Sequence, residues 1–132
     1  CFMRNITMEV VGELDRESAA AFMRSVGVSA AGIAIMQDKM IFRIVRLRQV
    51  PTKAANLIKQ TMLSKGADAA ISVHAADLSE PFTDVLLFAT LYQYRAAVRS
   101  LRRQPWGLRA LADDLTMLLG ISVREKQEFP AE

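Results

Sequence analysis

Few residues of this 132-residue chain could transfer protons near neutral pH. It contains one histidine, His74, which follows a predicted strand and opens a loop. Loops often carry functional residues, yet a lone loop histidine is also typical of a solvated or hydrogen-bonded side chain. No second histidine or cysteine pair is present to complete a zinc site, so metal catalysis is not predicted.

Two other patterns could indicate a catalytic or phosphate-binding site, and neither gives strong support for one. Asp113 and Asp114 are adjacent on a predicted helix, where neighbouring side chains point in different directions and do not share a site. All six glycines are isolated, so no glycine-rich loop is available to hold a phosphate or a dinucleotide. We therefore expect no catalytic residues, no metal and no cofactor in this chain.

A basic stripe is the most conspicuous polar pattern. Arg95, Arg99 and Arg102 recur at i, i+4 and i+7 on one predicted helix, with Arg103 beside them. Such a stripe could contact an acidic partner or a phosphate backbone, or it could simply be a solvated face near a helix C-terminus. Because no aromatic residues are interleaved for base stacking, nucleic acid is not the expected partner.

The composition is that of one packed domain. Hydrophobic residues make up 52% and charged residues 23%, and the formal net charge is only +3. No apolar run reaches the roughly 18 to 20 residues of a membrane span. Cys1 is the only cysteine, which excludes an intramolecular disulfide and agrees with a cytoplasmic location. We expect one compact domain over residues 1–120, followed by a charged tail or linker over 121–132.

Apolar periodicity and turn residues predict the elements that position these side chains. Strands are predicted over residues 5–11, 41–50, 67–73 and 84–90, the last covered on both faces. Helices are predicted over residues 15–26, 53–65, 91–103 and 108–119, with a short turn at 28–36. The order β-α-β-α-β-β-α-α indicates an α/β or α+β fold, a small mixed sheet of about four strands with helices packed on it. The unit from 41 to 73 is expected to form a right-handed parallel crossover.

Three ordered blocks of the sequence resemble a known family. AANLIKQTMLSKGADAAIS, residues 54–72, resembles AANILKQEMLSLGGDAAVS in the domain that precedes the catalytic barrel of some bacterial and archaeal dihydropteroate synthases. GVSAAGIAIMQDKMIFRIVRL and TDVLLFATLYQYRAAVRSLRRQPWGLRALADDL, residues 27–47 and 83–115, are similar to two further segments of the same family. The resemblance runs from about Met8 to Gly120.

The resemblance implies a parent transferase of folate biosynthesis that joins a pterin pyrophosphate to p-aminobenzoate. The pterin-binding loops of its barrel match nothing here, so this chain by itself is expected to lack synthase activity. Where the family shows Ser-Arg-Gly, this sequence has Ser72, Val73 and His74, and a binding role of that arginine and glycine would be weakened or lost. A domain fused before the first barrel strand lies at the end opposite the active site. It is therefore expected to serve assembly or regulation.

The resemblance also draws attention to three polar residues on one helix. Asn56, Lys59 and Gln60 lie away from its predicted buried stripe and indicate contact with the catalytic barrel of the same polypeptide, with a homo-oligomer partner or with a small anion; the alternative is simple solvation. The leading hypothesis is an accessory interaction domain of a dihydropteroate synthase-like enzyme. A free-standing binding module for an anion or nucleic acid, using the arginine-rich helix, is the alternative. A self-sufficient enzyme is the least supported reading.

Overall fold

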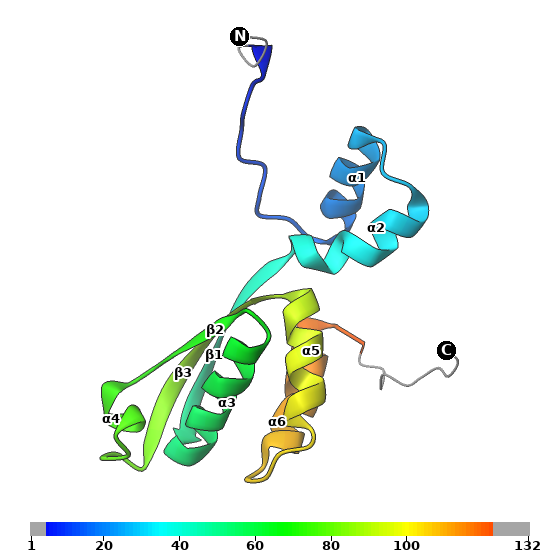
Figure 1. Ribbon diagram of the computed structural model, residues 1–132. Helices are drawn as coiled ribbons and strands as arrows, with labels where there is room; N and C mark the ends of the chain where they lie inside the picture. Colours follow the sequence, from blue (N-terminus) through cyan, green and yellow to red (C-terminus); the bar gives the residue numbers. More distant parts are fainter. Residues whose placement is uncertain (1–4, 123–132) are drawn as a thin grey trace.

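The computed structural model describes residues 5–122, apart from the side chain of Ala76, and has a mixed α/β architecture (Figure 1). The helices are α1 (Arg16–Val26), α2 (Ala30–Met36), α3 (Thr52–Ser64), α4 (Val73–Ala76), α5 (Leu91–Leu101) and α6 (Leu108–Leu119), with a 3-10 turn η2 (Gln37–Met40). The strands are β1 (Phe42–Pro51), β2 (Asp68–Ile71) and β3 (Phe82–Thr90). The predicted fold class is confirmed. Cys1 and most of the predicted tail, residues 123–132, lie outside the described residues.

The sheet has three described strands in the order β1-β3-β2. Both outer strands are antiparallel to β3, so β1 and β2 run in the same direction with β3 between them. The expected parallel relation of these two strands is confirmed, although they are not neighbours. The prediction of about four strands is corrected, because residues 5–11 form no strand and instead run away from the sheet.

Local signals fix the helix ends. Asp15 and Ser18 form a capping box at the start of α1, and Gly27 ends that helix at φ 94°, a left-handed conformation that glycine adopts without a steric penalty. A second capping box, formed by Thr90 and Gln93, starts α5 directly at the end of β3. The chain therefore turns from central strand to helix without a loop.

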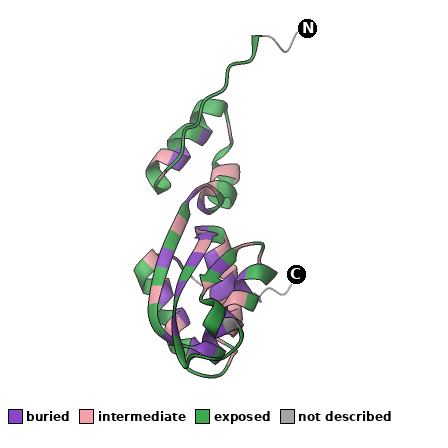
Figure 2. Cartoon of the chain, turned by 90° about the vertical axis from the view of Figure 1, so that its left-hand side faces the viewer, coloured by how far each residue is buried: buried purple, intermediate pink, exposed green. Residues whose placement is uncertain are grey.

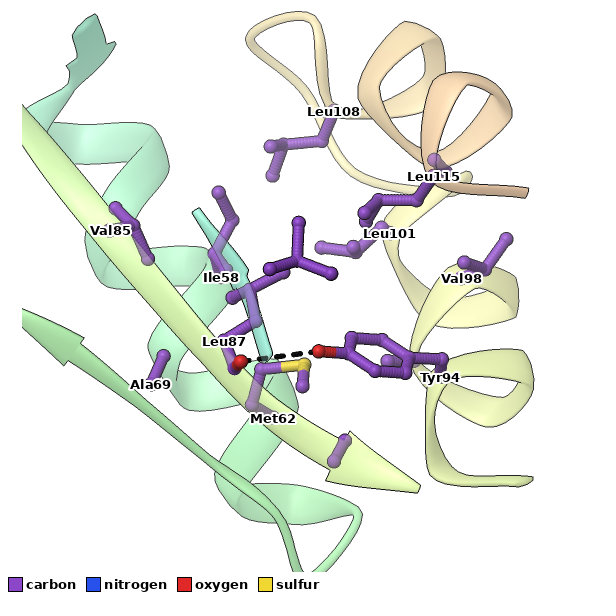
Figure 3. Close-up of a cluster of buried hydrophobic side chains, with 14 of the residues drawn as sticks. Ile58, Met62, Ala69, Val85, Leu87, Tyr94, Val98, Leu101, Leu108 and Leu115 are labelled. Carbon is purple, nitrogen blue, oxygen red and sulfur yellow. Dashed lines mark hydrogen bonds between the residues drawn. The ribbon is translucent and has the colours of Figure 1, made fainter. Parts of the chain in front are cut away.

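One face of the sheet carries the core. Along β3, buried and more exposed residues alternate, as expected when helices cover only one face. Tyr94, Ile58 and Leu101 project from α5 and α3 onto this face, and none of them is exposed to solvent (Figure 3). Burying each such side chain contributes on the order of 1.5 to 3 kcal/mol. The core thus joins α3, α5 and α6 to the sheet.

The opposite sheet face is open, which corrects the expectation that residues 84–90 are covered on both sides. Phe42 and Ile44 of β1 are 53% and 62% exposed, and Leu86 of β3 is 37% exposed. The register places Ile44 opposite Phe88 and Arg46 opposite Leu86, so these side chains share that face. Both faces of β3 carry apolar side chains, although helices cover only one of them. In the sequence alone, such a continuous apolar run predicts a strand that is buried on both faces.

The first two helices form a separate lobe at one end of the sheet. Figure 1 shows α1 and α2 above the sheet, reached through η2. Figure 2 shows that most of this lobe is exposed and that buried residues concentrate in the sheet and its helices. Polar contacts therefore matter for holding the lobe in place.

Candidate functional site

The three arginines of the α5 stripe have different environments. Arg95 Nη1 donates to Asp38 Oδ2 at 2.8 Å, and Arg102 forms an ion pair with Asp113 of α6. Arg99 is half-buried, and no partner is found for it within residues 5–122. Two of the three charges are thus already matched by carboxylates, which reduces the attraction that the stripe offers to a phosphate backbone. A contact role for the stripe stays a prediction.

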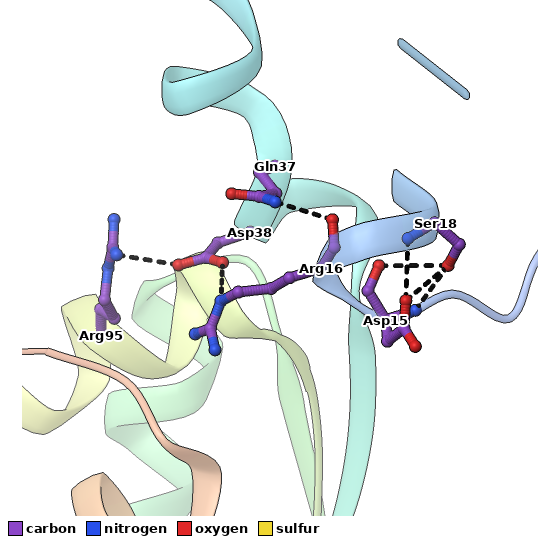
Figure 4. Close-up of polar contacts among 6 residues, drawn as sticks. All are labelled: Asp15, Arg16, Ser18, Gln37, Asp38 and Arg95. Atoms are coloured by element: carbon purple, nitrogen blue, oxygen red, sulfur yellow. Dashed lines mark hydrogen bonds and ion pairs between the residues drawn. The ribbon is translucent and has the colours of Figure 1, made fainter. Parts of the chain in front are cut away.

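Asp38 lies at the centre of a polar cluster between the lobe and the core (Figure 4). Its residue is 7% exposed, and its carboxylate accepts from Arg16 Nε at 3.2 Å as well as from Arg95. Next to it, Gln37 Nε2 donates to the Arg16 carbonyl oxygen at 2.7 Å. A poorly hydrated carboxylate needs such paired donors. The cluster therefore ties α1 and η2 to α5.

Two of the three polar residues singled out on α3 have partners inside the domain. The amide of Asn56 donates to the carbonyl oxygens of Thr52 and Ala75, at 2.9 and 3.0 Å. Lys59 Nζ donates to Asp68 Oδ1 at 2.9 Å and to the Ala69 carbonyl oxygen at 2.6 Å. These contacts connect α3 to α4 and to the edge strand β2.

Gln60 differs from its two neighbours. It is exposed, and its side chain makes no hydrogen bond to another residue in the described part of the chain. Of the three α3 residues, it is the one whose side chain is left to contact a partner outside the domain. The proposed contact role of all three is still a prediction.

Nearby hydrogen-bond donors lower the pKa values of two carboxyl groups, those of Asp68 and Asp77. The Lys59 ammonium, helped by the backbone N–H of Ala69, lowers the pKa of the Asp68 carboxyl. The hydroxyl and backbone N–H of Ser79 lower the pKa of Asp77. Both carboxylates are thus ionised at neutral pH, which makes them unsuited to act as general acids.

His74 lies on the short helix α4 and is exposed. Its Nδ1 is 3.4 Å from the Ser79 hydroxyl, which also donates to the His74 carbonyl oxygen at 3.3 Å. The backbone N–H of Ser79 donates to that carbonyl too, at 2.9 Å. The Ser79 hydroxyl is thus engaged with backbone, and the pair closes a local turn. It does not have the geometry of an activated nucleophile, which needs a base oriented by a third group.

No acid/base or metal constellation is assembled among residues 5–122. No cluster of three or more histidine, cysteine or acidic side chains suited to a metal ion occurs there. The structure brings Asn56 close to α4, the helix that carries His74. Arg95 on α5 and Arg102, the residue just after α5, bind other partners. The candidate residues therefore do not converge on one site.

Sequence reasoning missed Asp38 and a second feature at the start of α3. Asp38 lies in a short polar turn, and nothing in the residues around it predicts that its side chain is buried. Lys53 Nζ lies 5.8 Å from the centroid of the Trp106 ring, beside a pocket of about 460 Å³ that Pro51 and Pro81 also line. The break at residues 104–107 is the signal that could have identified this exposed tryptophan.

An apolar pocket opens in the N-terminal lobe. It has a volume of about 650 Å³, within the range of small-molecule sites. Its lining includes apolar side chains of the lobe, Lys39, and two residues of the N-terminal segment: Phe22, Val26, Met36, Met40, Lys39, Glu9 and Val11. The Lys39 ammonium also lies 4.7 Å from the centroid of the Tyr92 ring, a distance suited to a cation–π contact.

Comparison with known proteins identifies two related sequences of interest. Over 94 residues the chain is 33% identical to a probable bifunctional folylpolyglutamate synthase/dihydropteroate synthase of Halobacterium salinarum, which covers 71% of this chain and 11% of that protein. Over 106 residues it is 26% identical to a bifunctional dihydropteroate synthase/dihydropteroate reductase of Helicobacter pylori, covering 80% of this chain and 28% of that protein. The chain thus resembles only a small part of each of these larger fusion proteins.

Other comparisons give no match. No protein-family model matches the chain, and no solved structure matches it. None of the helices between residues 5 and 122 has the length and hydrophobicity needed to cross a lipid bilayer.

Proposed function

We propose that this chain is a non-catalytic accessory domain of a dihydropteroate synthase-like enzyme of folate biosynthesis. The observation that carries the proposal is the coverage: 71% and 80% of the chain are similar to two proteins named for dihydropteroate synthase, of which it matches 11% and 28%. A match of 106 residues is too short for a complete eight-stranded barrel, which needs about 250. The similarity therefore points to a segment other than the whole catalytic barrel.

The chemistry of the described residues supports an interaction role. Asn56, Lys59 and Arg95 are occupied by contacts inside the domain, which leaves the exposed side chain of Gln60 to contact a partner. The open sheet face, defined by Phe42, Ile44, Arg46, Leu86 and Phe88, offers apolar side chains that a partner domain would cover. The catalytic barrel of the same polypeptide is the partner that this proposal assigns to it.

The first test is the mass of the native protein in its own cells, detected with an antibody to this chain. If the proposal is correct, the band should have the mass of a polypeptide of about 400 residues, which is this domain plus a barrel of roughly 250. A band near the 14.7 kDa of the chain itself would contradict a fused enzyme.

A second test addresses the open sheet face in the full polypeptide. Leu86→Asp should lower the melting temperature of the whole enzyme while leaving the synthase kcat of the intact enzyme unchanged. Leu118→Asp on α6 is the matched control, because Leu118 is also exposed, at 69%. Equal behaviour of the two variants would contradict docking through this face.

A second candidate is a contribution to dihydropteroate reduction, and the name of the Helicobacter relative favours it. In hydride transfer a cofactor carries the chemistry and the protein binds and orients the reactants. The lack of an acid/base cluster between residues 5 and 122 therefore does not count against it, and the apolar lobe pocket is the place to test. The full polypeptide should reduce dihydropteroate with a nicotinamide or flavin donor, and Val26→Asp should abolish this activity but not synthase activity. Reduction that Val26→Asp leaves unchanged would exclude the pocket.

A further inference from the structure

The N-terminal segment, residues 5–11, has the sequence of a strand but no strand partner. Ile6, Met8 and Val10 alternate with Thr7 and Glu9, the period-two pattern of a strand with one apolar face. Those three apolar side chains are 57%, 92% and 95% exposed. Residues 6–11 form no backbone hydrogen bond with any other described residue.

The sheet has a free edge that such a segment would fit. β1 pairs with β3 alone among the described strands, so its other edge has no strand partner there. Near the start of β1, the carbonyl oxygens of Phe42 and Arg43 accept from the side chains of Arg43 and Tyr94, and residues 13–15 line a pocket with residues 42–44. β1 spans ten residues, longer than the segment. Exposed edges of this kind are templates for an added strand.

We propose that residues 5–11 pair with the free edge of β1 in a second copy of this chain, so that two copies exchange their N-terminal segments. In the structure the segment runs away from its own sheet, beyond the N-terminal lobe (Figures 1 and 2). Glu9 and Val11 of the segment line the lobe pocket, whereas Ile6, Met8 and Val10 are exposed and are available to another molecule. Reciprocal exchange gives a two-fold symmetric dimer, in which each contact occurs twice.

One antiparallel register satisfies both the apolar and the charged side chains. With Met8 opposite Ile44, Val10 lies opposite Phe42, and both pairs extend the open apolar face of the sheet. The same register places Glu9 opposite Arg43, which is half-buried on the other face. Opposite charges at directly opposed positions stabilise a strand pair, whereas like charges destabilise it. β1 also carries Arg46 and Arg48, so a segment with an acidic residue complements its charge.

The test begins with the mass of the 132-residue chain in solution, measured by light scattering over a range of concentrations. The chain has a mass of 14.7 kDa, and a species of twice that mass is expected. Glu9→Arg and Arg43→Glu should each weaken the dimer by roughly tenfold or more, because each places like charges opposite one another twice. The double variant should restore the dimer. Glu80→Arg, which makes the same charge change on an exposed loop, should leave it intact.

Cross-linking separates exchange between copies from closure onto the segment's own sheet. In a Cys1→Ser background, Met8→Cys and Ile44→Cys are made in separate chains and then mixed under oxidising conditions. Exchange predicts a disulfide between the two different chains. A monomeric chain at high concentration would overturn the proposal. A dimer whose stability is unchanged by Glu9→Arg and by Arg43→Glu would also overturn it. The same holds for a disulfide that forms only when both cysteines are in one chain.

Discussion

Arg95 and Asp38 are 57 positions apart in the sequence, and their side chains meet at 2.8 Å. Asp38 belongs to the turn η2 that leads out of the N-terminal lobe, and Arg95 belongs to α5, a helix of the core. Arg16 of α1 binds the other carboxylate oxygen. One carboxylate therefore connects the lobe to the rest of the domain.

Replacing Asp38 by Asn should weaken the attachment of the lobe to the core. The side chain of Asp38 is 10% exposed, whereas those of Arg16 and Arg95 are 44% and 33% exposed. The loss should lie between that of a surface pair and that of a buried pair, about 2 kcal/mol in the free energy of unfolding. Urea denaturation measures it. Asp114→Asn, which removes an exposed carboxylate from α6, should be close to neutral, and equal losses in the two variants would contradict the assignment.

Asn56→Ala tests whether Asn56 serves the fold. Removing the amide leaves the Ala75 carbonyl oxygen without that donor, so stability should fall by about 1 kcal/mol. Amide hydrogen exchange of residues 72–79 should become faster, because α4 loses its tie to α3. Gln60→Ala is the matched control and should change neither quantity. Unchanged exchange in Asn56→Ala would instead favour a contact role outside the domain.

The Lys59–Asp68 pair should make part of the stability depend on acid pH. The pKa of Asp68 is lowered in the folded state, first by the Lys59 hydrogen bond. A lowered carboxyl pKa contributes stability above its ordinary value of 3.8, and this contribution is lost as pH falls through the lower folded value. Asp68→Asn should therefore be less stable than the wild type at pH 6 and converge with it in strong acid. A constant difference across a pH series of thermal unfolding would show that the ion pair contributes little.

Tyr94 provides a test at the alkaline end. Its hydroxyl donates to the carbonyl oxygens of Arg43 and Leu87, at 2.8 and 3.2 Å, and Tyr94→Phe should cost about 1 to 2 kcal/mol at neutral pH. Burial raises the pKa of Tyr94 above its ordinary value of 10.0. Its share of stability is fully present below that value and is lost as pH rises above it. The stabilities of the wild type and Tyr94→Phe should therefore converge above pH 10; parallel curves would contradict this.

The helices were largely predictable because their signals are local. Asp15, Gly27 and Gly120 mark helix ends within a few residues of the chain, and the structure has caps at all three. The apolar stripes of α3 and α5 were equally readable. Ile58 and Met62 on α3, and Val98 and Leu101 on α5, recur at helical spacing and are buried. The strand signal of residues 5–11 was also local. Pairing, however, needs a second strand, which the described chain does not give to that segment.

By itself the sequence determined the α/β class, most element positions and the absence of a glycine-rich phosphate loop, because these depend on residue type and short-range periodicity. Only the tertiary structure decided the strand order, the open sheet face and the partners of Asn56, Lys59 and Arg95. A polar side chain on a predicted helix face has the same pattern whether it is solvated or bound inside the domain. The difference arises from carbonyl and carboxylate groups 9 to 57 positions away in the chain, which come within hydrogen-bonding distance only after the helices have packed on the sheet.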